Sequence, residues 1–99
     1  MLHADPDDPF LWYILALEYA KSGNTIRTDE VFDKLLNRFP EYLPTYYQAA
    51  NFFRENGAIE KARSAFIEGI RLAEITGETK TEQELRNSYQ NFLIDIDEL

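Results

Sequence analysis

The chain has 99 residues, of which 44% are hydrophobic and 14% aromatic, and this composition predicts a folded protein rather than a disordered one. Its formal net charge of −8 repels phosphate backbones and anionic lipid, so we expect neither a nucleic-acid partner nor a membrane partner. The sequence has no cysteine and no apolar run near the roughly 20 residues of a membrane-spanning helix, and both features favour a cytoplasmic protein.

The first part of the chain is predicted to form a helical hairpin, with helices at 9–22 and 26–39. Asp8 can cap the first helix, and Gly23 follows its last turn, where a left-handed residue is typical. Residues with i, i+3, i+4, i+7 spacing form the face that we expect to meet the second helix: Trp12, Leu15, Ala16 and Tyr19.

A shift of 34 residues places this pattern on the next part of the chain, which predicts a second hairpin with helices at 44–56 and 58–76. The positions that agree are those of the inner face and the turn, in the pairs Trp12/Tyr46, Leu15/Ala49, Ala16/Ala50, Tyr19/Phe53 and Gly23/Gly57. In both second helices a small residue stands four positions before Phe32 or Phe66, so each ring can enter the gap that small residues leave.

At these positions the sequence resembles the tetratricopeptide repeat family. Repeat 1 covers 9–42 and repeat 2 covers 43–76, with Leu35 larger than the family's small residue and Glu74 in place of the closing proline, so that the last helix of repeat 2 can continue. The resemblance implies an all-α fold with two helical hairpins in a right-handed α-α superhelix, and a single domain over 1–99. The whole chain also resembles small stand-alone bacterial proteins of this family.

A fifth helix is predicted at 80–97, where Thr81 and Glu84 can form a capping box, or Thr79 can supply the cap. Its apolar stripe consists of Leu85, Tyr89, Phe92, Leu93, Ile96 and Leu99. One interpretation is a capping helix that covers repeat 2, because a repeat array buries its faces only against neighbours. The other is that Phe92, Ile96 and Leu99 stay exposed and pair two copies of the chain.

The first helix carries a second apolar stripe, formed by Phe10, Tyr13, Ile14 and Leu17 and displaced by about half a turn from the first. In the tetratricopeptide family, the resemblance implies that these positions line a concave groove where a peptide docks. The predicted peptide-binding residues are Phe10, Tyr13, Leu17, Tyr47, Gln48, Asn51 and Arg54. We expect Tyr13 and Tyr47 to be exposed in the groove, and Ile14 to be buried.

The resemblance also identifies a subgroup that grips a peptide carboxylate with cations and asparagines. The matching positions here hold Tyr13, Leu17, Gln48, Glu78 and Glu82, so this clamp is absent, and a basic or aromatic-rich segment is the expected ligand.

Catalytic and metal-binding groups are scarce. The one histidine is His3, and the serines have no evident base, so we expect no enzyme activity, no cofactor and no metal site. Phe10 stands where an EF-hand loop after Asp5 would need glycine. The predicted function is noncatalytic protein-protein interaction by a monomer, and the alternative is a structural protein that forms a homodimer through the last helix.

Overall fold

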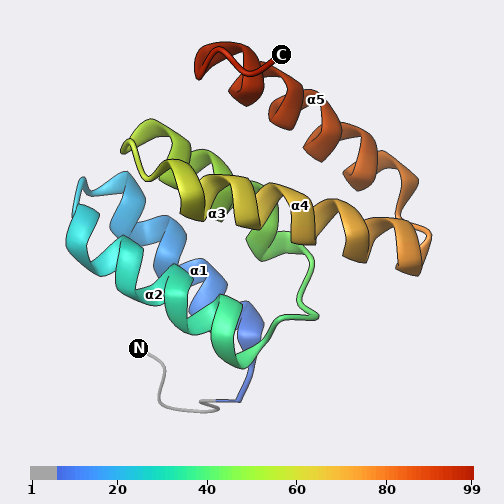
Figure 1. The fold of residues 1–99 in the computed structure, drawn as a ribbon. Coiled ribbons are helices and arrows are strands. Elements are labelled where there is room, and N and C mark those ends of the chain that lie inside the picture. Colours follow the sequence, from blue (N-terminus) through green and yellow to red (C-terminus); the bar gives the residue numbers. More distant parts are fainter. Residues whose placement is uncertain (1–6) are drawn as a thin grey trace. The chain divides into compact units, whose positions relative to one another are not determined.

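The computed structural model describes residues 7–99 and shows five helices with no strand among these residues (Figure 1). They are α1 (Pro9–Lys21), α2 (Thr25–Arg38), α3 (Pro44–Glu55), α4 (Ile59–Thr76) and α5 (Thr79–Asp95). The all-α prediction is therefore confirmed, and each predicted helix is found with ends that differ by two residues at most. The chain divides after Thr45 into two compact units, which are described separately below.

The first unit contains the hairpin of α1 and α2. Asp8 caps α1 as predicted, because its Oδ1 accepts a hydrogen bond of 2.9 Å from the Phe10 N–H. Asn24 caps α2 by accepting from the Arg27 N–H, at 3.2 Å. The two helices bury a small apolar core whose fully or nearly fully buried members are Ala16, Thr28, Val31, Phe32 and Leu35.

The second unit contains most of α3, together with α4 and α5. Its core combines small residues with rings: Tyr46, Ala49, Ala50, Phe53, Ala62, Ala65, Phe66, Ile70, Ala73, Leu85 and Phe92 are buried. Gly69 on α4 lies so close to α3 that a Cβ there would be 2.6 Å from the Tyr46 Cβ. The predicted alternation of small and aromatic residues thus allows close helix packing.

The turns repeat one motif. Gly23 and Gly57 have the left-handed φ values predicted for them, 79° and 75°. Beyond α4, Gly77 adopts the same conformation, and beyond α5 Asp97 does so with φ 64°. In each of these four turns, the N–H of the residue after the left-handed one donates to a carbonyl five positions back, as in the 2.8 Å bond from Glu98 to Leu93. Asp97 therefore takes the role of a turn glycine, and it ends α5 two residues before the predicted end.

The start of α5 differs from the prediction. Glu78 precedes the first helical residue, and no side chain caps the helix there, so the predicted Thr79 cap and the Thr81–Glu84 capping box do not form. The Glu78 N–H instead donates to the Ala73 carbonyl at 2.9 Å, which closes the turn after α4. Because the turn from α4 already fixes this backbone, the helix begins without a threonine cap.

Candidate peptide-binding surface

The α1 side of the predicted groove is apolar and partly accessible to solvent. Phe10 is 51% exposed and Ile14 is 40% exposed, and the two lie one helical turn apart. Tyr13 and Leu17 are half-buried. The expectation that Ile14 is buried was wrong, because its side chain belongs to the outward stripe of α1.

Tyr13 has a packing role as well. Its ring meets the ring of Tyr42 edge to face, with centroids 5.8 Å apart and planes inclined by 69°. Burial raises the pKa of Tyr42, and the neighbouring Tyr13 and Asp8 raise it further, so the Tyr42 hydroxyl stays neutral well into the alkaline range. Sequence reasoning did not predict Tyr42, since its contact depends on how the loop after α2 folds back toward α1.

The α3 side carries one exposed aromatic residue and three polar ones. Tyr47 is 37% exposed, whereas Gln48, Asn51 and Arg54 are half-buried. Asn51 donates from Nδ2 to the Tyr47 carbonyl at 3.0 Å, and its Oδ1 accepts from the Arg54 Nη1 at 3.5 Å. The side chains of Asn51 and Arg54 are therefore oriented by contacts within α3.

Arg54 is also bound by the last helix. Its Nε and Nη2 atoms both donate to Oδ2 of Asp95, at 3.1 Å and 2.5 Å. The Asp95 carboxylate on α5 thus binds the Arg54 guanidinium, which we predicted to contact a peptide ligand. The sequence shows the acidic residues near the end of the chain, but not which of them meets Arg54.

The last helix covers α4 with aromatic side chains. Phe92 is fully buried, with its ring centroid 5.5 Å from that of Phe66, and Tyr89 lies 5.6 Å from Phe66. Of the two interpretations of the last helix, the alternative in which Phe92 stays exposed to pair two copies is therefore wrong for this residue. Ile96 is half-buried, and Leu99 is 71% exposed.

Within residues 7–99, no group of three or more histidine, cysteine or acidic side chains could hold a metal ion. No helix in this range is long and apolar enough to cross a membrane. His3 and Asp5 lie outside the described residues.

The chain is similar to two solved structures of a tetratricopeptide repeat domain protein from Salinibacter ruber. A solution NMR structure matches with 31% identity and a TM-score of 0.82, over 89% of each chain. A crystal structure matches with 29% identity and a TM-score of 0.81, over 86% of this chain and 96% of that one. No protein-family model and no curated protein matches the sequence. The structural match, with its sequence identity over nearly the whole chain, shows that this protein belongs to the tetratricopeptide repeat family.

Proposed function

We propose that this protein is a noncatalytic interaction module that binds a peptide segment of a partner protein, as a monomer in the cytoplasm. The tetratricopeptide fold is typically an interaction module, which supports the general class. The proposed contact residues are those of the predicted groove: Phe10, Tyr13, Leu17, Tyr47, Gln48, Asn51 and Arg54. The observation that carries the proposal is the exposure of large apolar side chains on α1 and α3.

The α1 stripe is unusual for a short surface helix. The opposite side of α1 already supplies Ala16 to the core of the hairpin, so Phe10 and Ile14 are not needed for packing against α2. When a helix has two apolar sides and only one packs against its neighbour, the other side exposes apolar surface to water. Contiguous surface of this kind marks interaction sites. In repeat 2, Tyr47 occupies the position of Tyr13 and is 37% exposed, more than the half-buried Tyr13.

The expected ligand is basic or aromatic-rich. The carboxylate clamp residues of the family are absent, and the net charge of −8 attracts cations. Aromatic side chains such as Phe10 and Tyr47 provide large contact areas, and Gln48 and Asn51 provide hydrogen-bonding groups beside them. A ligand carboxylate would have to displace Asp95 from Arg54, which disfavours an acidic segment.

Self-association through α5 has weaker support. Phe92 is buried against α4, so it cannot contribute to a contact between two copies without unfolding the end of this unit. The affinity purification described next can detect binding of a second copy, and that result would favour self-association.

Affinity purification of the tagged protein from the organism that carries its gene tests the proposal. The test variant is Phe10→Ala with Tyr47→Ala, since both side chains are exposed and Tyr13 has a packing contact that complicates its substitution. The matched control is Ile26→Ala with Ile75→Ala, which removes exposed apolar groups from α2 and α4. We expect a partner that the wild type and the control retain and the test variant loses. Retention by the test variant, or capture only of a second copy, contradicts the proposal.

A further inference from the structure

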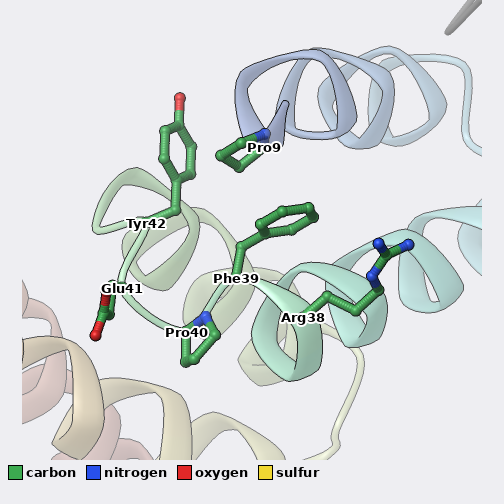
Figure 2. Close-up of a pocket in the computed structure, with 6 residues that line it drawn as sticks. All are labelled: Pro9, Arg38, Phe39, Pro40, Glu41 and Tyr42. Atoms are coloured by element: carbon green, nitrogen blue, oxygen red, sulfur yellow. The ribbon is translucent and has the colours of Figure 1, made fainter. Parts of the chain in front are cut away.

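A hollow lies in the first unit, between the start of α1 and the loop that follows α2. It has a volume of about 310 Å³, and six residues line it: Pro9, Arg38, Phe39, Pro40, Glu41 and Tyr42 (Figure 2). Four of these six residues contribute rings. Figure 2 shows Pro9, Phe39 and Tyr42 grouped around the same space, with Arg38 and Glu41 on opposite sides of it and the Glu41 carboxylate directed outward.

The two charged residues of the hollow differ in their partners. Arg38 donates to Asp7 at 3.2 Å, and its guanidinium carbon lies 5.4 Å from the centre of the Phe39 ring. Glu41 is exposed, and within residues 7–99 its carboxylate forms neither an ion pair nor a hydrogen bond. The cation of the hollow is therefore neutralised in place, while the anion is available to a ligand.

The wider surroundings of the hollow are also negative. The carboxylate of Asp8 lies close enough to Tyr42 to raise the pKa of its hydroxyl, after the larger effect of burial. The chain as a whole carries a charge of −8. An anionic ligand would compete with Asp7 for Arg38 and be repelled by Glu41. A cation instead meets the Glu41 carboxylate, which has no partner within residues 7–99, beside the rings that line the hollow.

We propose that this hollow binds an arginine or lysine side chain of a partner protein. The aliphatic stem of such a side chain can lie along the rings of Phe39 and Tyr42, while its charged end reaches Glu41 at the rim. A volume of about 310 Å³ is at the lower end of the range for small-molecule sites, roughly 300–1,000 Å³, which suits one inserted side chain better than a larger ligand. The hollow and the peptide-binding surface proposed above have no lining residue in common. The two sites are connected by the ring contact of Tyr42 with Tyr13.

NMR titration of the ¹⁵N-labelled protein with short capped peptides tests this site directly. The probes are acetylated and amidated Gly-Gly-Xaa-Gly-Gly peptides in which Xaa is arginine, lysine, norleucine or glutamate. We expect the arginine and lysine peptides to shift the amide signals of Phe39, Glu41 and Tyr42, and the other two peptides to leave them nearly unchanged. Because norleucine has the length of the lysine stem without its charge, equal shifts with norleucine overturn the proposal.

Two variants separate the effect of the Glu41 carboxylate on binding from the effect of the protein's net charge. Glu41→Gln should weaken binding of the arginine peptide about fivefold, which corresponds to about 1 kcal/mol. Glu55→Gln removes the same charge from the exposed end of α3 and should leave the affinity unchanged. Equal weakening by both variants, tighter binding of the glutamate peptide, or no shift with any peptide at millimolar concentration contradicts the site. The variant Tyr47→Ala should not alter the titration, so this site and the proposed peptide-binding surface can fail separately.

Discussion

Arg63 on α4 holds Glu98, beyond the end of α5, in a two-pronged ion pair. The Nη1–Oε1 distance is 2.9 Å and the Nη2–Oε2 distance is 3.0 Å. The left-handed Asp97 turns the chain so that Glu98 follows the end of the helix back toward α4. Arg63 also lies over the ring of Phe92, with its guanidinium carbon 6.0 Å from the ring centre. One arginine thus connects the buried ring of Phe92 with the last turn of the chain.

The ion pair predicts a pH dependence of stability. The hydrogen bond from Arg63 lowers the pKa of Glu98 below its ordinary value of 4.5, so the folded state binds this proton less readily than the unfolded state. The stabilisation is therefore complete above pH 4.5 and is lost as the pH falls through the lowered pKa. We expect Glu98→Gln to lower the melting temperature at pH 7 and to have little effect at pH 2, as measured by circular dichroism.

Glu55→Gln is the control for this comparison, because it removes an exposed carboxylate that makes no ion pair in the described part of the chain. Its effect should be small at both pH values. A melting-temperature difference for Glu98→Gln that is the same at pH 7 and pH 2 would show that the charge of Glu98 contributes nothing.

Truncation of the ring of Phe92 tests the packing of α5. Phe92→Ala removes a fully buried ring that contacts Phe66 and should reduce the free energy of unfolding of the second unit by about 3–5 kcal/mol. Ile94→Ala, at a side chain that is 56% exposed, should change it by less than about 0.5 kcal/mol. Urea denaturation followed by circular dichroism measures both, and Trp12 fluorescence reports separately on the first unit. Equal effects of the two substitutions would contradict the capping role.

Gly69 is expected to tolerate no side chain. An alanine Cβ would lie 2.6 Å from the Tyr46 Cβ, an atom fixed to its own backbone, so one of the two helices must move. Overpacking of this kind costs about 1–3 kcal/mol, and it should exceed the gain of about 1 kcal/mol that alanine normally gives over glycine in a helix. Ser64→Ala, on the exposed side of α4, should be neutral or slightly stabilising. A stabilised Gly69→Ala protein in urea denaturation would show that α3 and α4 are not in such close contact.

Thr45 offers a substitution that should stabilise the protein. Its side chain is fully buried, and no group within residues 7–99 forms a hydrogen bond with its hydroxyl. A buried hydroxyl without a partner costs about 1–3 kcal/mol, so Thr45→Val should raise the free energy of unfolding by about 1 kcal/mol. Thr28→Val is the comparison, because the Thr28 hydroxyl donates to the Asn24 carbonyl at 2.8 Å and its loss should be destabilising. Equal effects of the two valine substitutions on urea midpoints would contradict this difference.

The sequence was sufficient to predict the hairpins because their determinants are local. The spacing of Trp12, Ala16 and Tyr19 follows one helix face, and Gly23 and Gly57 take the left-handed conformation that glycine adopts without steric cost. The burial of Phe32 and Phe66 follows from the small residues opposite them. Each of these features is settled by residues close together in the chain.

The features that the sequence did not predict depend on contacts between distant residues. Asp95 meets Arg54 across 41 positions, and Glu98 meets Arg63 across 35, so neither pair leaves a local pattern. The missing cap of α5 has a different cause, since the turn at Gly77 fixes the start of that helix before Thr79 can contribute. The hollow beside Tyr42 combines Pro9 with a loop about 30 residues later, which periodicity cannot reveal.

Site-specific photocrosslinking in living cells tests whether the exposed side chains of α1 and α3 contact a partner protein. A benzoylphenylalanine residue is introduced, in separate proteins, at the exposed positions Phe10 and Tyr47 on α1 and α3, and at Ile26 and Ile75 on α2 and α4. We expect one crosslinked partner protein, of a mass different from that of this chain, at Phe10 and Tyr47 and not at Ile26 or Ile75. Crosslinks to the same partner only from Ile26 and Ile75, or crosslinks only between two copies of this chain, would contradict it.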